Sequence, residues 1–256
     1  MNVAENGLRV IVLGGSGYVG AEVVRWLSSQ GHQVVFTFGK GEARAQELMR
    51  ELPSATAERV DLASFAEVSR FVERAATNWG GLHALVQCAG LAGAASLYQP
   101  QVDADLRRGY LDGVVESDWD EMFNVTVKST FAAVQTAAPW MRRNMNGNIV
   151  IVGSQNSLRP LPAPAHFAAA KGALKAFTEA MAKSLGEDGI CINLVAPGML
   201  DGGMAKLLPP AHVHDYLANT ALMRAGQARE VAETVGWLVT ENTYVTGQSI
   251  LLDGGL

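Results

Sequence analysis

Short runs rich in β-branched and aromatic residues alternate with longer helical patterns along the whole 256-residue chain. The expected strands are residues 8–13, 33–38, 56–60, 84–88, 148–153, 190–195 and 249–252. The expected helices are residues 18–29, 42–52, 64–78, 119–144, 165–185 and 228–239. This alternation is typical of right-handed strand–helix–strand units. It predicts one doubly wound α/β domain over residues 1–256, in which helices cover both faces of a parallel sheet.

Composition restricts the classes of function. An apolar fraction of 48% and a charged fraction of 18% suit a globular protein. The net charge of −5, without a long basic cluster, argues against nucleic acid as a partner. The sequence contains no apolar run of membrane-spanning length and no signal-peptide pattern, so we expect a cytoplasmic protein that does not insert into membranes. Cys88 and Cys191 are expected to pack as reduced thiols, and no metal site is expected.

The first expected strand leads directly into a glycine-rich turn. Its sequence is Leu13-Gly14-Gly15-Ser16-Gly17-Tyr18-Val19-Gly20. Glycines allow the backbone to turn sharply and to approach a pyrophosphate, whose charge is held by free amides at the helix start. An ordinary tight loop is the alternative, but the strand–turn–helix setting favours a dinucleotide site. The candidate cofactor contacts are Gly14, Ser16, Gly17, Tyr18, Val19 and Gly20.

The end of the second expected strand bears on the choice of cofactor. It continues as Phe38-Gly39-Lys40, and no acidic residue follows before Glu42. A carboxylate here suits the ribose hydroxyls of NAD, whereas positive charge suits the 2′-phosphate of NADP. We therefore expect NADP(H), with Phe38, Gly39 and Lys40 beside the adenosine. A solvated loop lysine is the alternative for Lys40.

Further motifs follow in order along the chain. They are Asp61-Leu62, Gln87-Cys88-Ala89-Gly90, Asn124, Ser154, Lys171, Pro197-Gly198, Val245-Thr246-Gly247-Gln248 and Asp253-Gly254-Gly255. With these motifs the chain resembles the short-chain dehydrogenase/reductase family over its whole length. Within that family it is most similar to the β-ketoacyl-acyl-carrier-protein reductases. The resemblance implies a single Rossmann-type sheet.

The resemblance also implies contacts with the cofactor. Asp61 and Leu62 would meet the adenine ring, and Lys171 would bind the hydroxyls of the nicotinamide ribose. The remaining positions would line the ribose and the nicotinamide; they are Ala89, Gly90, Pro197, Gly198 and the backbone of Leu200.

For the substrate, the resemblance implies that Ser154 hydrogen-bonds the carbonyl oxygen. Asn124 would hold a water molecule in a proton relay. A family tyrosine would act as the acid, but Phe167 stands in its place. Phe167 and Lys171 are one helical turn apart and share a face, yet a phenyl ring cannot donate a proton.

Three explanations for Phe167 remain open. The chain is a deliberate Tyr-to-Phe variant made to trap a complex, a natural reductase with another acid, or a cofactor-binding protein without catalysis. We favour the first, because a site that had abandoned chemistry would have little reason to retain Ser154, Lys171 and Asn124.

Replacement acids are few in the sequence. His166 lies about 100° around the helix from Phe167, so we interpret it as a capping or surface histidine. Tyr98 and Tyr110 belong to an inserted loop, residues 91–117, which we expect to border the substrate entrance rather than to supply the acid.

Smaller departures from the family pattern concern the cofactor. Leu13 replaces a threonine, Tyr18 replaces a glycine, and Gln87-Cys88 replaces Asn-Asn. Gly202 takes the place of a threonine that often helps to fix the carboxamide. The glycine spacing is therefore closer to that of the extended members of the family than to the classical ones.

The resulting expectation is an NADP(H)-dependent ketoreductase that acts on a β-keto or related carbonyl of an acyl or polyketide chain. The alternative is a non-catalytic NADP-binding or sensing protein. Apolar residues in the segment 199–223, Tyr216 among them, suit an acyl chain or simply structural packing. Arg142 and Arg143 suit either an acyl carrier protein or a solvated helix end. Apolar stripes on helices 119–144 and 165–185 lead us to expect a homodimer or homotetramer.

Overall fold

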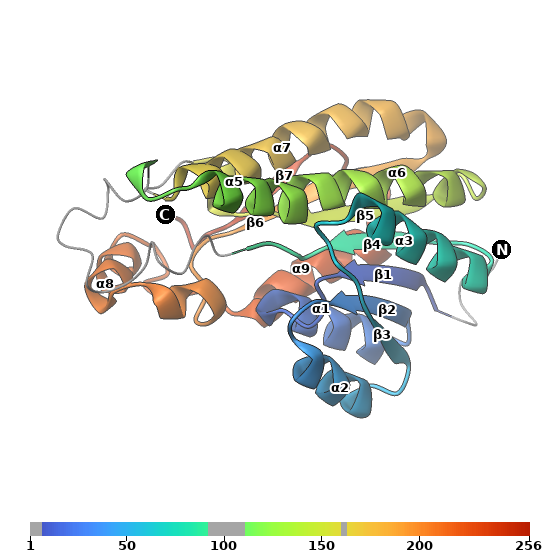
Figure 1. Ribbon diagram of the computed structural model, residues 1–256, viewed down its shortest axis with the longest axis horizontal. Coiled ribbons are helices and arrows are strands. Elements are labelled where there is room, and N and C mark those ends of the chain that lie inside the picture. The colour runs from blue at the N-terminus through green and yellow to red at the C-terminus, as the bar shows by residue number, and fades with distance from the viewer. Residues whose placement is uncertain (1–6, 92–110, 160–162) are drawn as a thin grey trace.

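The computed structural model describes residues 7–91, 111–159 and 163–256 (Figure 1). Within these ranges seven parallel strands form one sheet in the order β3-β2-β1-β4-β5-β6-β7. The strands are β1 Arg9–Leu13, β2 Gln33–Phe38, β3 Ala55–Arg59, β4 Ala84–Gln87, β5 Gly147–Val152, β6 Ile190–Pro197 and β7 Ser249–Leu252. The predicted doubly wound parallel sheet is confirmed, and the strand ends move by at most two residues.

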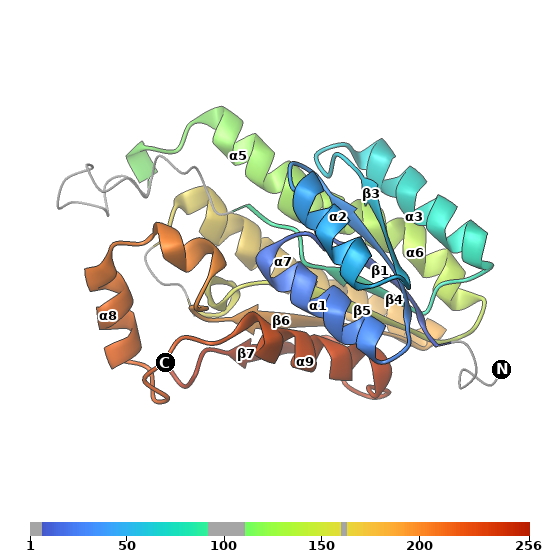
Figure 2. The ribbon, with the colours of Figure 1, turned by 90° about the horizontal axis from the view of Figure 1, so that it is seen from below.

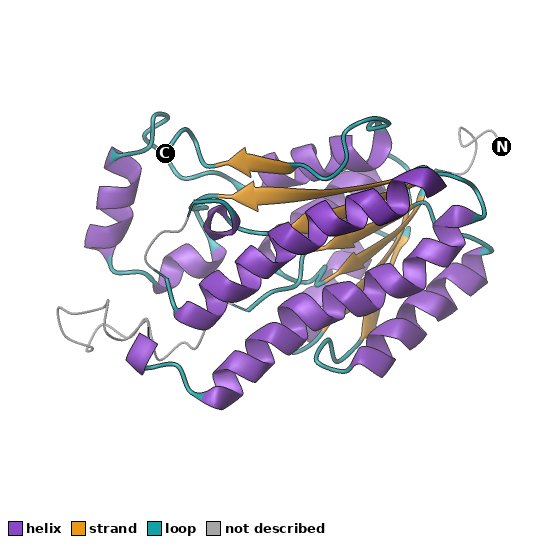
Figure 3. Cartoon of the chain, turned by 90° about the horizontal axis from the view of Figure 1, so that it is seen from above, coloured by secondary structure: helices purple, strands orange, loops and turns teal. Residues whose placement is uncertain are grey.

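Helices cover both faces of this sheet, as the views from below and above show (Figures 2 and 3). They are α1 Tyr18–Ser29, α2 Glu42–Glu51, α3 Phe65–Trp79, α5 Glu116–Phe123, α6 Ser129–Arg142, α7 Ala165–Leu185, α8 Pro210–Ala218 and α9 Ala228–Thr240. Helices α1, α2 and α9 pack on one face, and α3, α6 and α7 pack on the other.

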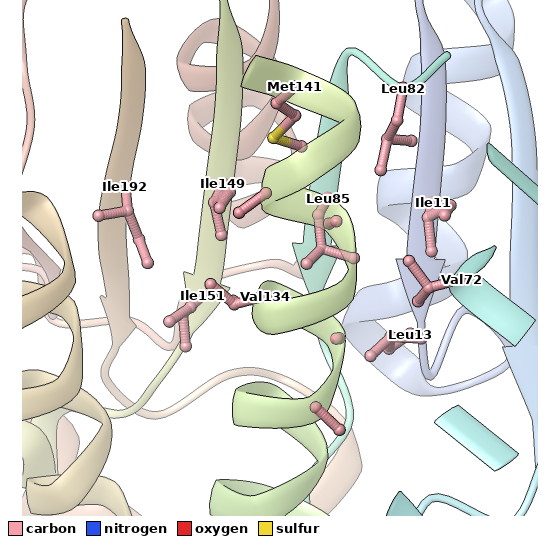
Figure 4. Packing of buried hydrophobic residues seen from close by; sticks show 14 of the residues in the cluster. Ile11, Leu13, Val72, Leu82, Leu85, Val134, Met141, Ile149, Ile151 and Ile192 are labelled. Carbon is pink, nitrogen blue, oxygen red and sulfur yellow. The ribbon is translucent and has the colours of Figure 1, made fainter. Parts of the chain in front are cut away.

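The alternation of side chains along each strand produces two hydrophobic cores. In β1, Ile11 and Leu13 point into the core under α3, α6 and α7, while Val10 and Val12 point into the core over α1, α2 and α9. Figure 4 shows the first core, where Leu85 and Ile149 of the neighbouring strands continue the same layer. Burial on both faces explains why the strands read as continuous apolar runs.

One predicted helix is interrupted in the structure. Residues 119–144 were expected to be continuous, but a π-helical turn, Asn124–Lys128, separates α5 from α6. Ser129 and Thr130 hydrogen-bond the carbonyls four residues earlier at 2.6 Å, and the side-chain amide of Gln87 donates to both hydroxyls. Hydroxyls that bond in this way bend helices. Single π turns recur at functional sites, and this one begins at Asn124.

The segment 199–223 contains an element that the sequence pattern did not predict. Helix α8 begins at Pro210, whose ring fixes the backbone φ at a value that suits the first residue of a helix. Three short 3₁₀ turns are also present; they are Gln155–Ser157, Gly186–Asp188 and Gly203–Leu207.

Among the helices that the structure describes, none is long and apolar enough to cross a membrane. Tyr98, Tyr110 and most of the insertion 91–117 lie outside the described residues.

Candidate active site

The glycine turn lies at the point where the strand order reverses. Strands β1 and β4 are neighbours, and the chain runs from β1 into α1 on one face and from β4 toward the opposite face. In open α/β sheets ligands bind at this crevice. Gly14 has a φ of +75°, and a Cβ there would lie 2.7 Å from the Cα of Ala89. The turn and Ala89 therefore approach each other as closely as glycine allows.

The same turn leaves the start of α1 open. The Gly14 amide donates to Thr37 Oγ1 at 2.8 Å, and the Gly17 amide donates to the Gly14 carbonyl at 3.0 Å. A Cβ on Gly20 would lie 2.2 Å from that carbonyl, so the first turn of α1 packs directly on the loop. Gly17 precedes the helix without a side-chain cap. Uncapped amides at a helix start suit an anionic group such as a pyrophosphate, so the residues present fit a dinucleotide.

Positive charge gathers beside the end of β2. Lys40 is exposed. A Cβ on Gly41 would lie 2.9 Å from the guanidinium of Arg44 and 3.0 Å from Ser16 Oγ, so both side chains lie beside this glycine. Arg59 pairs in register with Phe38 and is also exposed. No carboxylate in the described ranges forms an ion pair with these three cations. Arg44 was not predicted, although its place in the first turn of α2, directly after the loop that carries Lys40, was a usable signal.

Asp61 and Leu62 follow β3, two strands away from β1. The Asp61 carboxylate accepts a hydrogen bond from the Ala63 amide at 3.0 Å, and the Asp61 amide donates to Glu67 at 3.0 Å. Leu62 packs against the core that contains Leu13. Both residues thus lie at the carboxyl edge that also carries Phe38 and Gly39.

Pro197, Gly198 and Leu200 follow one another at the end of β6. Pro197 pairs with Leu252, and the Gly198 amide donates to the Leu252 carbonyl at 2.8 Å. Leu200 forms a single parallel bridge with Gly226, just before α9. The structure therefore holds this segment firmly at the carboxyl edge, on the opposite side of β4 and β5 from the glycine turn.

Phe167 and Lys171 share the inner face of α7. Phe167 is 3% exposed and packs against Met122 and Ala170. Lys171 is 6% exposed, its Nζ lies 5.7 Å from the centre of the Phe167 ring, and a Cβ on Gly90 would lie 3.2 Å from that Nζ. No described residue hydrogen-bonds the Nζ. A largely buried ammonium with no hydrogen-bond acceptor among the described residues suits the hydroxyls of a bound ribose.

Burial sets the ionisation of the groups around Lys171. It lowers the pKa of the Lys171 ammonium to about 8, and the nearby Cys88 opposes this effect slightly. Burial raises the pKa of the Cys88 thiol to about 12, against a smaller effect of Lys171. Near pH 7 the thiol is therefore neutral and the ammonium is mostly charged, with its midpoint about one pH unit higher. Both Cys88 and Cys191 are free thiols.

Ser154 and Asn124 approach α7 from two different elements. Ser154 follows β5, and its hydroxyl accepts a hydrogen bond from the Asn156 amide at 3.3 Å. The 3₁₀ turn after it contacts α7. Asn124 begins the π turn, and its side-chain oxygen accepts a hydrogen bond from Lys128 Nζ at 3.3 Å. The nearby Phe123 and Val127 pack against the cluster of Met122, Phe167 and Ala170. The structure thus brings the four predicted catalytic positions to one end of α7.

Two sequence interpretations need correction. His166 is not a capping or surface residue, because it is 1% exposed, and burial lowers the pKa of its imidazole. Among the described residues its Nδ1 has no hydrogen-bond partner, and the charge of Asp118 on α5 raises the imidazole pKa by less than burial lowers it. Tyr216 is more than apolar lining. Its hydroxyl donates to Gln155 Oε1 at 2.7 Å and accepts from the Met199 amide at 3.0 Å.

The two arginines at the end of α6 are engaged within the protein. Arg142 pairs with Asp188 at 2.5 Å, and the Arg143 guanidinium lies 3.9 Å from the centre of the Trp140 ring. Asp188 therefore neutralises part of the basic pair.

Comparison with known proteins agrees with this arrangement. Residues 16–256 match a family model described as Enoyl-(Acyl carrier protein) reductase. The 3-oxoacyl-[acyl-carrier-protein] reductase FabG of Thermotoga maritima is 32% identical over 191 residues, covering 74% of this chain and 72% of the relative. A relative named as ketoacyl reductase 2 of the granaticin polyketide synthase, from Streptomyces violaceoruber, is 30% identical over 248 residues, covering 96% of this chain and 94% of the relative.

A solved structure supports the same grouping. A short-chain dehydrogenase of Burkholderia cenocepacia in complex with NADP superimposes with a TM-score of 0.82 at 30% identity, covering 97% of each chain. Proteins of this kind bind nicotinamide cofactors. Since the family model spans nearly the whole sequence and the fold agrees with it, this chain belongs to the short-chain dehydrogenase/reductase family of oxidoreductases.

Proposed function

We propose that this protein is an NADP(H)-dependent ketoreductase for a β-keto or related carbonyl on an acyl or polyketide chain. The observation that carries the proposal is the convergence of Ser154, Lys171 and Asn124 at one end of α7, beside an open glycine turn. The names of the curated relatives support ketoacyl substrates.

The proposed cofactor contacts extend along the carboxyl edge of the sheet. When bound, the cofactor supplies the hydride that adds to the carbonyl carbon. Lys40 and Arg44 would hold the 2′-phosphate, and the amides after Gly17 would hold the pyrophosphate. Other contacts would come from Gly14, Ser16, Tyr18, Val19, Gly20, Phe38, Gly39, Asp61, Leu62, Ala89, Gly90, Pro197, Gly198 and Leu200.

The residues of α7 and β5 would act on the substrate. Ser154 donates a hydrogen bond to the carbonyl oxygen and so stabilises the negative charge that develops there. Lys171 fixes the ribose and adds positive charge, and Asn124 orders the water that would refill the proton donor. Phe167 fills the place of that donor without a hydroxyl. We therefore propose that this chain binds its ligands but transfers the proton slowly.

A second candidate, a non-catalytic NADP-binding protein, is favoured by Phe167 itself. The two candidates differ in the fate of NADPH. Incubation with NADPH and a series of 3-oxoacyl thioesters should give slow, enzyme-dependent loss of NADPH absorbance if the site is a reductase. Tight NADPH binding with no loss at any chain length, even after Phe167→Tyr, would support the second candidate instead.

The ammonium of Lys171 should make cofactor affinity depend on pH. Its pKa is about 8 in the free protein, and bound ribose hydroxyls favour the charged form. NADPH affinity should therefore be fully present below pH 8 and fall by up to about tenfold per pH unit above it. Titration of NADPH across this range checks the effect. Lys171→Met should bind more weakly at neutral pH and lose the pH dependence, whereas an unchanged profile would remove Lys171 from the cofactor site.

Exposed aromatic side chains on α5 and α6 bear on the proposed assembly. Trp119 and Phe131 are 41% and 43% exposed on α5 and α6, and Trp119 stacks on Phe123 with ring centres 5.1 Å apart. These apolar side chains support a homodimer or homotetramer through α5, α6 and α7. We propose that the substrate is either a free acyl compound or one bound to an acyl carrier protein, and that the protein acts in the cytoplasm. The insertion 91–117 is proposed to border the entrance to the substrate site.

A further inference from the structure

Tyr18 connects the glycine turn to a segment 183 residues later in the sequence. Its hydroxyl donates a hydrogen bond to the Asp201 carboxylate. Asp201 belongs to the post-β6 segment, residues 199–208, which lies beside the start of α1 (Figure 2). One side chain therefore joins the start of α1 to the post-β6 segment.

The Tyr18 ring also explains a glycine in that segment. Gly202 is buried, and a Cβ there would lie 2.5 Å from Cζ and 2.6 Å from Cε2 of the ring. The backbone of Gly202 has φ −152° and ψ −166°, which every residue can adopt. The need for glycine therefore comes from the ring and not from the backbone. Tyr18 fits only because residue 202 has no side chain, and a larger residue at position 202 would fit only without the Tyr18 ring.

Tyr18 is placed between two parts of the proposed cofactor site. It is the first residue of α1, whose amides would hold the pyrophosphate, and it contacts the segment that follows Pro197 and Gly198 beside the proposed nicotinamide. The side chain is 40% exposed, so it lies at the open edge and not in a core. Burial, together with the Asp201 carboxylate, raises the pKa of its hydroxyl to about 12. The hydroxyl therefore stays protonated and can donate.

Building on the proposed function, we propose that Tyr18 is a positioning residue for the cofactor. Its contacts with Asp201 and Gly202 hold the post-β6 segment against the glycine turn. Because the two parts would lie on either side of the bound dinucleotide, the Tyr18–Asp201 hydrogen bond has to break before the cofactor leaves. The dissociation rate should then depend on this bond more than the association rate does.

Tyr18→Phe tests the hydrogen bond, because it removes only the hydroxyl. We expect NADPH to dissociate about 3- to 10-fold faster in stopped-flow fluorescence, with little change in association. Hydrogen exchange without cofactor should also become faster in amides 201–208. Tyr244→Phe is the matched control, since Tyr244 is 94% exposed, and it should change neither measurement.

Gly202→Ala tests the ring contact in two backgrounds. With Tyr18 present, the new methyl group should displace the post-β6 segment and raise the NADPH dissociation constant about tenfold or more. In Tyr18→Ala the space is open, so the same methyl group should have almost no further effect. This difference between backgrounds is the signature of a direct contact.

The outcomes separate this proposal from the proposed function. Failure of the unchanged chain to bind NADPH would contradict the proposed function, while hydrogen exchange would still report on the Tyr18 contact. Unchanged exchange and dissociation in Tyr18→Phe would overturn the positioning role. Faster hydrogen exchange in Tyr18→Phe with an unchanged NADPH dissociation rate would overturn the link between Tyr18 and the cofactor. An equal rise of the NADPH dissociation constant on Gly202→Ala, with and without the Tyr18 ring, would overturn it too.

Discussion

Phe167→Tyr should increase turnover of a β-ketoacyl substrate by about 10²- to 10⁴-fold, the contribution of a positioned general acid. The ring is 3% exposed and shares its face of α7 with Lys171. A hydroxyl added at the far end of this ring would have Ser154 and the substrate oxygen as partners. The Lys171 ammonium, 5.7 Å from the ring centre, would lower the phenol pKa.

Steady-state kinetics with NADPH at saturating concentration measures this effect. Phe131→Tyr adds the same hydroxyl to a ring on α6 that lies in the proposed subunit interface, and it should leave turnover unchanged when size-exclusion chromatography shows the same assembly. Adding Lys171→Met to Phe167→Tyr should reverse most of the gain. Brisk turnover by the unchanged Phe form would show that the acid lies elsewhere, with His166 or a water held by Asn124 as the next candidates.

Reversal of charge at Lys40 and Arg44 should reverse the preference between the two cofactors. The double variant Lys40→Glu, Arg44→Glu replaces two attractions for the 2′-phosphate with two repulsions. Each exposed charge pair is worth up to about 1 kcal/mol, so the NADPH dissociation constant should rise by about 10²-fold or more. NADH lacks this phosphate and should bind as before. The single variant Lys40→Glu should at least erase the preference.

Titration of both cofactors into each variant checks the prediction. Lys183→Glu, an exposed lysine near the end of α7, is the matched control and should change neither constant. The NADPH effect should also shrink as salt is added, because exposed charges are screened. Equal dissociation constants for NADPH and NADH in the unchanged chain would contradict the assignment of NADP(H).

The parallel sheet could be predicted because local pattern and burial agree along the chain. Strands covered on both faces, such as β1 and β5, carry uninterrupted apolar runs, residues 10–13 and 149–152, and glycine or polar residues flank these runs. The positions of Ser154, Phe167 and Lys171 were also predictable, since strand ends and helical spacing place them. Their exposure and pKa values were not, because these depend on packing against α5 and the π turn.

Features that depend on distant contacts could not be predicted from the sequence. The π turn at Asn124 is one of them, because the side chain of Gln87 on β4 donates hydrogen bonds to Ser129 and Thr130 just after that turn. His166 was misinterpreted, because its angle on the helix did not reveal that it is buried. The Tyr18–Asp201 contact joins residues 183 positions apart, beyond any local pattern.

The most direct test of the ketoreductase assignment follows deuterium from the nicotinamide C4 of labelled NADPH into product, with the Phe167→Tyr variant as catalyst. A 3-oxoacyl thioester should give a 3-hydroxyacyl product that carries one deuterium on the carbinol carbon. The corresponding enoyl thioester should remain unreduced. Deuterium in a saturated acyl chain, or none in any product although NADPH binds, would contradict the assignment.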